Sequence, residues 1–198
     1  IDLSSAPRRA FLTHCSALGL WALTGAAAAA NAQGPKPRLL VLGDSLSAEY
    51  GLARGSGWVA LLEQRLAREK LAWQVVNASI SGDTTSGGRS RLPALLKQHQ
   101  PQVVIIELGG NDALRGLPLA MTQANLAEMT RLAKAAGARV LVAGIAVAPN
   151  YGRAYGEGLL ALFGTVAKAE GAALVPFLLS GVADAPNADD LFQPDRIH

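Results

Sequence analysis

Two short segments, far apart in the sequence, hold the side chains that a serine–histidine–acid arrangement requires. Ser45 lies in Gly-Asp-Ser-Leu-Ser, directly after a run of apolar residues, whereas Asp195 and His198 are three residues apart in Asp-Arg-Ile-His. A serine hydroxyl is a weak nucleophile until a neighbouring base accepts its proton. The three-residue spacing lets the carboxylate hold one ring nitrogen of the imidazole, which leaves the other for the hydroxyl. We therefore predict that these three residues meet in one site.

Few other residues in the sequence could supply this chemistry. The sequence has one cysteine, Cys15, and three histidines, His14, His99 and His198. Cys15 and His14 belong to an N-terminal segment that differs from the rest, so the remainder has no thiol nucleophile. His99 lies in the polar run Lys-Gln-His-Gln-Pro, which is typical of a solvated connection, and we interpret it as a surface residue. His198 is therefore the candidate base.

Two further loops could stabilise negative charge on a substrate oxygen. Gly82 follows an apolar run, and a glycine can bring a backbone N–H close to a ligand. Asn111 follows Gly-Gly after another apolar run, and its side-chain NH₂ can donate to an oxyanion. The competing interpretation is a turn or helix cap, where Asn and Asp are ordinary residues. The stretch from Gly82 to Gly88 has the glycine spacing of a phosphate-binding loop but lacks its lysine, so we predict no nucleotide site.

Alternating strands and helices are needed to bring these loops together. Apolar runs predict strands, and apolar residues at helical spacing predict helices between them. This order predicts an α/β domain with a parallel sheet covered on both faces. Ligands of such sheets bind beyond the carboxyl ends of the strands, where Ser45, Gly82 and Asn111 are expected. The expected strands cover residues 38–42, 73–76, 103–106, 140–145 and 173–175, and the expected helices cover 58–69, 90–98, 118–136 and 157–169.

Taken in order, these motifs resemble those of the SGNH hydrolases, also called the GDSL family. Gly-Asp-Ser-Leu-Ser matches the first block at Ser45, Gly82 matches the second, Gly-Gly-Asn-Asp matches the third at Asn111, and Asp-x-x-His matches the last at Asp195 and His198. The resemblance spans nearly all of residues 33–198. It is closest to the periplasmic acyl-CoA thioesterase I/protease I/lysophospholipase (arylesterase) group. It implies a three-layer α/β/α sandwich with a mainly parallel five-stranded sheet of the flavodoxin-like type.

The resemblance also implies a function and a role for each matching residue. Ser45 would be the nucleophile, and Asp195 and His198 would transfer protons. The backbone N–H groups of Ser45 and Gly82 would form the oxyanion hole with Asn111. The implied enzyme is a serine esterase or thioesterase that acts on acyl esters or thioesters without a metal or other cofactor. A carbohydrate-ester deacetylase and a non-catalytic binding module on the same fold are the alternatives. Further residues are expected to contact the substrate: Asp44, Leu46, Asn150 and Tyr151.

The first 32 residues have the layout of a secretory signal peptide. Arg8 and Arg9 precede an apolar stretch from about residue 17 to 30, and Ala-Asn-Ala at 30–32 offers small residues for cleavage. Pro-Arg-Arg-Ala-Phe-Leu also resembles a twin-arginine signal. The apolar stretch is shorter than the roughly 20 residues of a spanning helix, so we expect no stable membrane anchor. A lipid anchor on Cys15 fits less well. The predicted location is periplasmic or secreted.

Composition and charge limit the range of partners. Hydrophobic residues make up 50% of the sequence and charged residues 17%, and the net charge of +3 is not clustered as nucleic-acid binding would require. We expect one domain over residues 33–198, a monomer, and a small-molecule substrate as its partner. Members of the resembling group continue past the histidine with a proline and a last helix, so we expect the domain as given to be truncated after His198.

Overall fold

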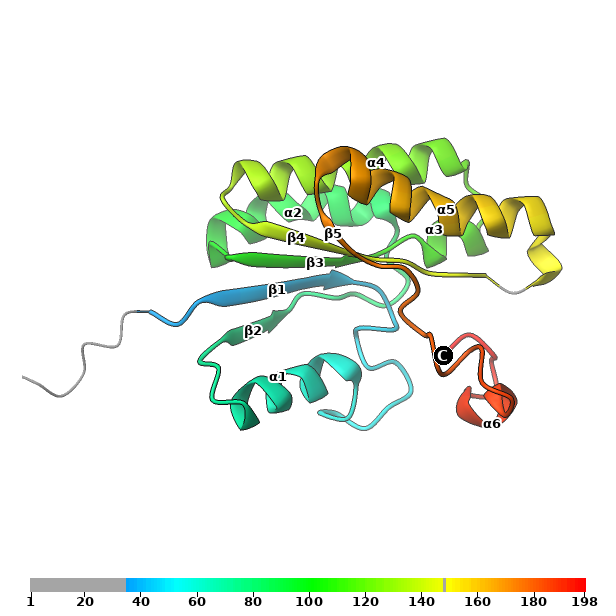
Figure 1. Cartoon of the computed structure of the whole chain (residues 1–198), viewed down its shortest axis with the longest axis horizontal. Helices are drawn as coiled ribbons and strands as arrows, with labels where there is room; N and C mark the ends of the chain where they lie inside the picture. Colours follow the sequence, from blue (N-terminus) through cyan, green and yellow to red (C-terminus); the bar gives the residue numbers. More distant parts are fainter. Residues whose placement is uncertain (1–34, 148) are drawn as a thin grey trace, which may run out of the picture. The chain divides into compact units, whose positions relative to one another are not determined.

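The computed structural model describes residues 35–147 and 149–198, and the predicted signal peptide at 1–32 lies outside them. Strands and helices alternate along the described residues, as the sequence predicts (Figure 1). The strands are β1 (Arg38–Gly43), β2 (Gln74–Asn77), β3 (Val103–Glu107), β4 (Arg139–Ala143) and β5 (Ala173–Val175). The helices are α1 (Trp58–Arg68), α2 (Thr85–His99), α3 (Gly110–Leu114), α4 (Leu119–Ala135), the 3₁₀ helix η1 (Pro149–Tyr151), α5 (Arg153–Glu170) and α6 (Ala188–Leu191).

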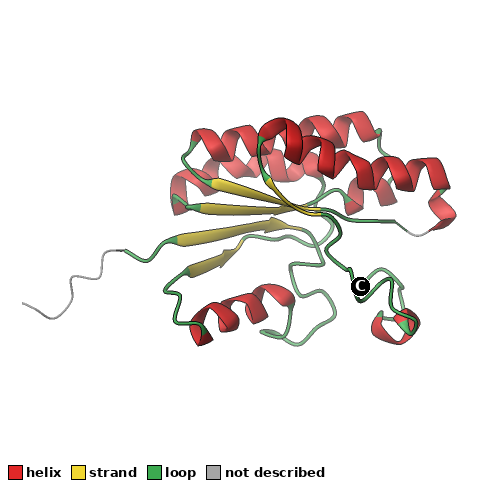
Figure 2. Ribbon diagram, viewed as in Figure 1, coloured by secondary structure: helices red, strands yellow, loops and turns green. Residues whose placement is uncertain are grey.

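The five strands form one parallel sheet in the order β2-β1-β3-β4-β5. β1 lies between β2 and β3, with Leu40 opposite both Val76 and Val104. The order of the strands changes direction between β1 and β3, which is where ligands bind in doubly wound sheets. The loops that follow these strands leave the sheet at one edge (Figure 2). The predicted parallel sheet is confirmed.

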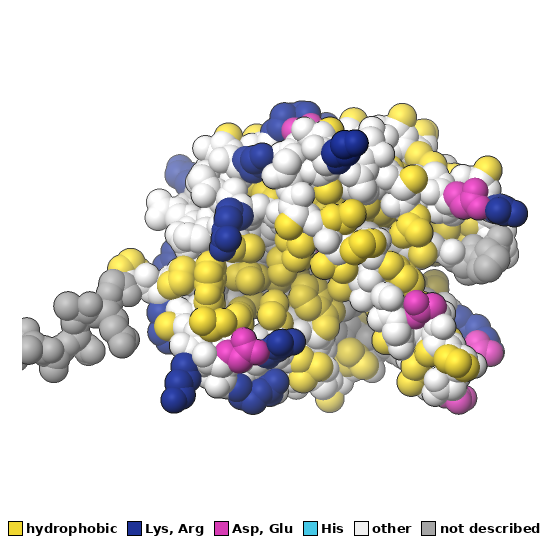
Figure 3. All heavy atoms as spheres, viewed as in Figure 1, with side chains coloured by type: hydrophobic (Ala, Val, Ile, Leu, Met, Phe, Trp, Pro, Cys, Tyr) yellow, Lys and Arg dark blue, Asp and Glu magenta, His cyan; other side chains and the backbone are white. Residues whose placement is uncertain are grey.

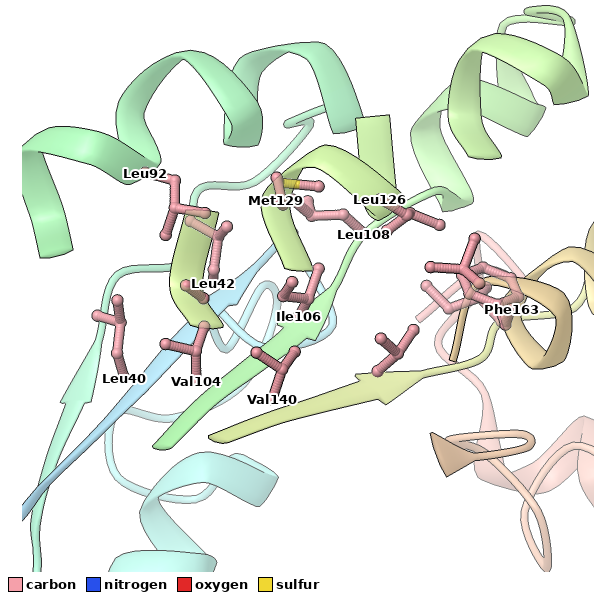
Figure 4. Packing of buried hydrophobic residues seen from close by; sticks show 14 of the residues in the cluster. Leu40, Leu42, Leu92, Val104, Ile106, Leu108, Leu126, Met129, Val140 and Phe163 are labelled. Carbon is pink, nitrogen blue, oxygen red and sulfur yellow. The ribbon is translucent and has the colours of Figure 1, made fainter. Parts of the chain in front are cut away.

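Helices cover both faces of the sheet, as the predicted three-layer arrangement requires. α2, α4 and α5 lie on one face and α1 lies on the other (Figure 1). The larger core fills the space under the first group, where Leu92 of α2, Met129 of α4 and Phe163 of α5 belong to one buried cluster with the strands (Figure 4). A smaller cluster, which contains Val41 and Val59, joins α1 to the opposite face. Apolar side chains also gather on the outer surface beside α1 (Figure 3).

The start of α2 differs from the sequence prediction. We expected a glycine-rich loop and a helix from Ser90, but the helix begins at Thr85 and Thr84 caps it. Gly88 lies in the first turns, and a Cβ added there would lie 2.3 Å from the Leu108 side chain. The glycine therefore serves close packing of α2 on the core and does not form a loop.

Candidate active site

Ser45 lies in the turn that follows β1, at the carboxyl edge of the sheet. The turn is closed by a hydrogen bond of 2.9 Å from the Ala48 N–H to the Asp44 carbonyl. The Asp44 carboxylate also accepts a hydrogen bond of 3.1 Å from the Leu46 N–H. Because a tight turn follows the strand directly, the Ser45 hydroxyl is held beyond the sheet edge rather than in the ladder.

The imidazole of His198 bridges the Ser45 hydroxyl and the Asp195 carboxylate. Its Nε2 lies 2.7 Å from Ser45 Oγ, and its Nδ1 lies 2.7 Å from Asp195 Oδ2. The other carboxylate oxygen accepts hydrogen bonds of 3.0 Å from the backbone N–H groups of Ile197 and His198. The Ile197 N–H, followed by the His198 side chain and backbone, lowers the pKa of Asp195 to about 2. The carboxylate is therefore ionised at neutral pH and accepts a hydrogen bond from the imidazole.

Tyr50 holds the loop with Asp195 and His198 against the serine turn. The Tyr50 and His198 ring centroids are 4.5 Å apart, with 39° between the ring planes. The Tyr50 carbonyl also accepts a hydrogen bond of 2.8 Å from the Gln193 side chain, 143 residues along the chain. Sequence reasoning missed Tyr50 because neither its type nor its spacing indicates a contact with so distant a segment.

Asn111 lies in α3, the short helix that follows β3. Its Nδ2 donates a hydrogen bond of 3.1 Å to Asp44 Oδ2. One N–H of the amide is thus engaged, and the second is left for another acceptor. Asp44 is only 2% exposed, and burial, as the largest cause, raises its pKa to about 6. The carboxylate predicted to contact the substrate therefore also orients the predicted oxyanion donor.

Gly82 lies in the loop after β2, with a φ of +80° that glycine adopts without strain. Its carbonyl accepts a hydrogen bond of 2.9 Å from the Arg115 guanidinium. The same loop is fixed to the end of β1, because the Ile80 N–H donates to the Gly43 carbonyl at 3.0 Å. The structure therefore places Gly82 in a loop adjoining the serine strand.

A buried polar network joins this loop to α3. Asp112 is fully buried and accepts hydrogen bonds from the Thr85 N–H at 2.8 Å, from the Thr85 hydroxyl and from the Thr122 hydroxyl at 3.3 Å. The Thr85 hydroxyl in turn accepts a hydrogen bond of 3.0 Å from the side-chain amide of Asn125 in α4. Because Asp112 adjoins Asn111, the network fixes α3 relative to the loop after β2.

Two other charged residues near the site were not predicted. Arg91 of α2 forms an ion pair of 2.8 Å with Asp83, and it donates to the carbonyls of Ala78 and Gly43. Glu107, the last residue of β3, is fully buried. An acidic residue that ends an apolar strand is a signal that could have identified Glu107. Arg91 gave no such signal, because basic residues are common on helix surfaces.

A cleft of about 850 Å³ opens beside Ser45. Asn111 and Asp195 line it with Ser45, whereas Gly82 and His198 are not among its lining residues. All four residues predicted to contact substrate line the cleft: Asp44, Leu46, Asn150 and Tyr151. Apolar side chains from several elements form much of the remaining wall, among them Leu114, Ile145, Val147, Phe177, Leu179 and Phe192.

The rest of the described chain adds little to the site. His99 lies at the amino ends of the strands, away from the site. Its carbonyl accepts a hydrogen bond of 2.9 Å from the side chain of Arg38, the first residue of β1. Across residues 35–147 and 149–198, no group of three or more His, Cys, Asp or Glu side chains is placed to hold a metal ion. None of the helices in those ranges combines the length and apolar character needed to cross a membrane.

Comparisons with known proteins place this geometry in a family. Residues 41–198 match the model of the GDSL-like lipase/acylhydrolase family. Esterase TesA of Pseudomonas aeruginosa is 51% identical over 191 residues, which cover 96% of this chain and 89% of that protein. Thioesterase 1/protease 1/lysophospholipase L1 of Escherichia coli is 44% identical over 192 residues, with 94% and 86% covered. A crystal structure of TesA, 53% identical, superposes with a TM-score of 0.77 over 81% of this chain and 88% of that one. The chain therefore belongs to the GDSL-like lipase/acylhydrolase family.

Proposed function

We propose that this protein is a serine hydrolase that cleaves acyl esters or acyl thioesters through an acyl-Ser45 intermediate. The observation that carries the proposal is the alignment of Ser45, His198 and Asp195 through two contacts of 2.7 Å. The relatives named as an esterase and as a thioesterase/protease/lysophospholipase support it, since the chain matches them over most of its length. All of these reactions begin with attack on a carbonyl carbon, which is what an activated serine does.

In acylation, His198 Nε2 accepts the Ser45 proton while Oγ attacks the substrate carbonyl carbon. The carbonyl oxygen becomes negatively charged. The backbone N–H groups of Ser45 and Gly82, together with the free N–H of Asn111, stabilise that charge. Asp195 keeps the imidazole in the correct tautomer and stabilises its protonated form. The bond to the leaving group then breaks, and the departing alcohol or thiol takes the proton from His198.

Deacylation repeats these steps with water in place of the serine. His198 removes a proton from a water molecule, whose oxygen attacks the acyl carbon of the intermediate. The charge on the acyl oxygen again falls beside the oxyanion donors. When the bond to Ser45 breaks, Oγ recovers its proton from His198, and the products are a carboxylic acid and the free enzyme.

The cleft supports an acyl or aryl group as the part of the substrate that is recognised. Its wall is largely apolar, so it favours burial of hydrocarbon next to the reacting carbonyl. Leu46 follows the nucleophile directly, and Asn150 and Tyr151 extend the wall from η1. We assign these three residues, with Asp44, to substrate contact.

We further infer that residues 1–32 are a signal peptide and that the domain beginning at residue 33 acts as a monomer in the periplasm or outside the cell. The basic, apolar and small-residue order of the N-terminal segment supports this inference. N-terminal sequencing of protein from the periplasmic fraction is expected to begin at Gln33. Recovery of the full-length chain from the cytoplasm alone would contradict it.

The reaction is tested with p-nitrophenyl esters and acyl-CoA thioesters of graded chain length. We expect turnover of both classes, and we expect Ser45→Ala to lower kcat by more than about 1,000-fold without changing the unfolding transition. Mass spectrometry after treatment with an alkyl phosphonate ester is expected to show one adduct, on Ser45. Deacetylation of xylan without turnover of thioesters would favour the carbohydrate-ester alternative. Full activity of Ser45→Ala would exclude the proposed mechanism.

A further inference from the structure

Glu107 is a fully buried carboxyl group directly beneath the nucleophile turn. It ends β3 opposite Gly43, the residue that ends β1. The Glu107 side chain lies so close to the Gly43 backbone that a Cβ added at Gly43 would lie 2.8 Å from Glu107 Oε2. The other residues of β3 are all Val or Ile, and an apolar residue at this position would avoid the free-energy cost of burying a carboxyl group. The mechanism proposed above does not use this group.

Glu107 contacts the nucleophile turn on both sides of Ser45. Its Oε2 accepts a hydrogen bond of 2.6 Å from the Ser47 hydroxyl and a second one, of 3.3 Å, from the Asp44 N–H. Asp44 directly precedes the nucleophile Ser45, and Ser47 lies two positions after it. Oε1 has no hydrogen-bond partner within the described part of the chain. A single carboxylate oxygen therefore fixes the segment that carries Ser45.

Other hydrogen bonds extend this connection to neighbouring elements. The Ser47 hydroxyl accepts a hydrogen bond of 3.1 Å from the indole N–H of Trp58, the first residue of α1. The Ser47 carbonyl accepts a hydrogen bond of 2.7 Å from the side-chain amide of Asn77, the last residue of β2. Ser47 is only 1% exposed, so these bonds are shielded from water. Ser47 and Glu107 thus connect the nucleophile turn to β2, β3 and α1.

We propose that Glu107 is a positioning residue for the hydrolysis reaction, which fixes the nucleophile turn through Ser47 and the Asp44 amide. The proposal rests on the function proposed above. The 2.7 Å contact between Ser45 Oγ and His198 depends on the path of this turn, because the Ser45 hydroxyl has no other hydrogen-bond partner among the described residues. A displacement of about 1 Å at a reacting group is enough to lower a rate about 100-fold.

The protonation state of Glu107 guides the choice of variants. Burial, followed by the charge of Asp44, raises the pKa of Glu107 well above its ordinary value. Because burial disfavours the charged form, a neutral side chain of the same shape is the conservative replacement. Glu107→Gln keeps an oxygen that can accept from Ser47 and Asp44, whereas Glu107→Leu removes it at similar volume.

The test compares these two variants in steady-state hydrolysis of a p-nitrophenyl ester. We expect Glu107→Leu to lower kcat about 100-fold with KM within about threefold, and Glu107→Gln to restore kcat to within about fivefold of the wild type. The control is Thr130→Val, which removes another buried hydroxyl, one that bonds only within α4. It is expected to lower stability without changing kcat. A folded Glu107→Leu variant with wild-type kcat would overturn the proposal.

Two further measurements keep the outcome decisive. If Glu107→Leu does not fold, Ser47→Ala removes the hydroxyl that donates to Glu107, and its kcat is expected to fall about tenfold. An unchanged kcat in Ser47→Ala then overturns the proposal. The rate at which an alkyl phosphonate ester modifies Ser45 is measured for every variant, and it is expected to fall in parallel with kcat. Because this reaction needs no natural substrate, it tests Glu107 even if the wild type hydrolyses none of the esters and the proposed function fails.

Discussion

The side-chain amide of Asn111 can donate two hydrogen bonds, and the structure shows the acceptor of one. That acceptor is the buried carboxylate of Asp44, 3.1 Å from Nδ2. The bond restricts rotation of the amide, so the second N–H keeps a fixed direction. A donor that is oriented before the reaction needs no reorganisation when charge develops on the substrate oxygen.

Removal of this amide should therefore affect the transition state more than substrate binding. We expect Asn111→Ala to lower kcat by about 100-fold or more, with a smaller change in KM. Steady-state kinetics with one p-nitrophenyl ester measures both parameters. A variant with the wild-type kcat would remove Asn111 from the oxyanion hole.

Asp44 makes stability depend on pH. Burial raises its pKa from 3.8 to about 6, so the folded protein keeps this proton over a range where the unfolded chain has lost it. The contribution of this group to stability is complete below the unfolded value and is lost as the pH rises through about 6. Asp44→Asn does not titrate. We therefore expect the variant to gain stability relative to the wild type between about pH 4 and 7, by up to roughly 3 kcal/mol.

Urea denaturation of the two proteins at both pH values measures this difference. Glu107 is present in both proteins, but the charge of Asp44 raises its pKa, so the measured difference also includes the change in the titration of Glu107. A stability difference that is the same at both pH values would contradict the assignment of the raised pKa to Asp44.

At the residue scale, much of the candidate site could be predicted from the sequence. Ser45, Asp195 and His198 were identifiable because their types are chemically special and their local spacing is informative. Tyr50 was not, because its contact is with a segment that it meets only in the folded chain. The acidic end of an apolar strand could have marked Glu107 as unusual, but it does not indicate which residues Glu107 contacts. Local patterns carry no information on which distant backbone group a carboxyl or a ring will contact.

At the scale of elements, α2 and α3 are connected by the buried Asp112 carboxylate. Thr85 begins α2 and donates to Asp112 through both its N–H and its hydroxyl. Asp112 lies one residue after Asn111 in α3. The loop before α2 contains Gly82, so two of the three predicted oxyanion donors, Gly82 and Asn111, adjoin the same buried network. Loss of one bond in the network should therefore affect stability and rate together.

Thr85→Val tests this connection, because it removes the hydroxyl at constant volume. We expect the free energy of unfolding to fall by about 1 to 3 kcal/mol, since Asp112 and Asn125 each lose a buried partner. We also expect kcat to fall, as measured with the same ester. Thr130→Val is the matched control, because its hydroxyl bonds to the Leu126 carbonyl of its own helix. Equal behaviour of the two variants would contradict a link to the site.

The elements themselves were predicted unevenly. The strand at 173–175 was predicted with the bounds that the structure has, and β1 and β3 each extend one residue further than expected. Continuous apolar runs mark buried parallel strands well. By contrast, α3, α6 and η1 were not predicted, because helices of three to five residues are too short to show a period. α3, for example, is held in place by the tertiary hydrogen bonds of Asp112.

At the scale of the whole domain, the strand order explains why the site forms where it does. The turn after β1 carries Ser45, and β3 on one side leads to Asn111 while β2 on the other leads to Gly82. Three adjacent strands thus deliver three loops to one edge. The His198 loop then reaches the same edge from beyond β5, and Tyr50 and Gln193 hold it there.

Ser45 and His198 are 153 positions apart in the sequence, and this separation has a consequence for the protein while it is being made. A ribosome that adds about 5 to 20 residues per second completes the imidazole roughly 8 to 30 s after the hydroxyl. During that interval the nascent polypeptide has a serine with no base beside it. A newly synthesised molecule is therefore expected to be unreactive toward cellular acyl groups until His198 has been added.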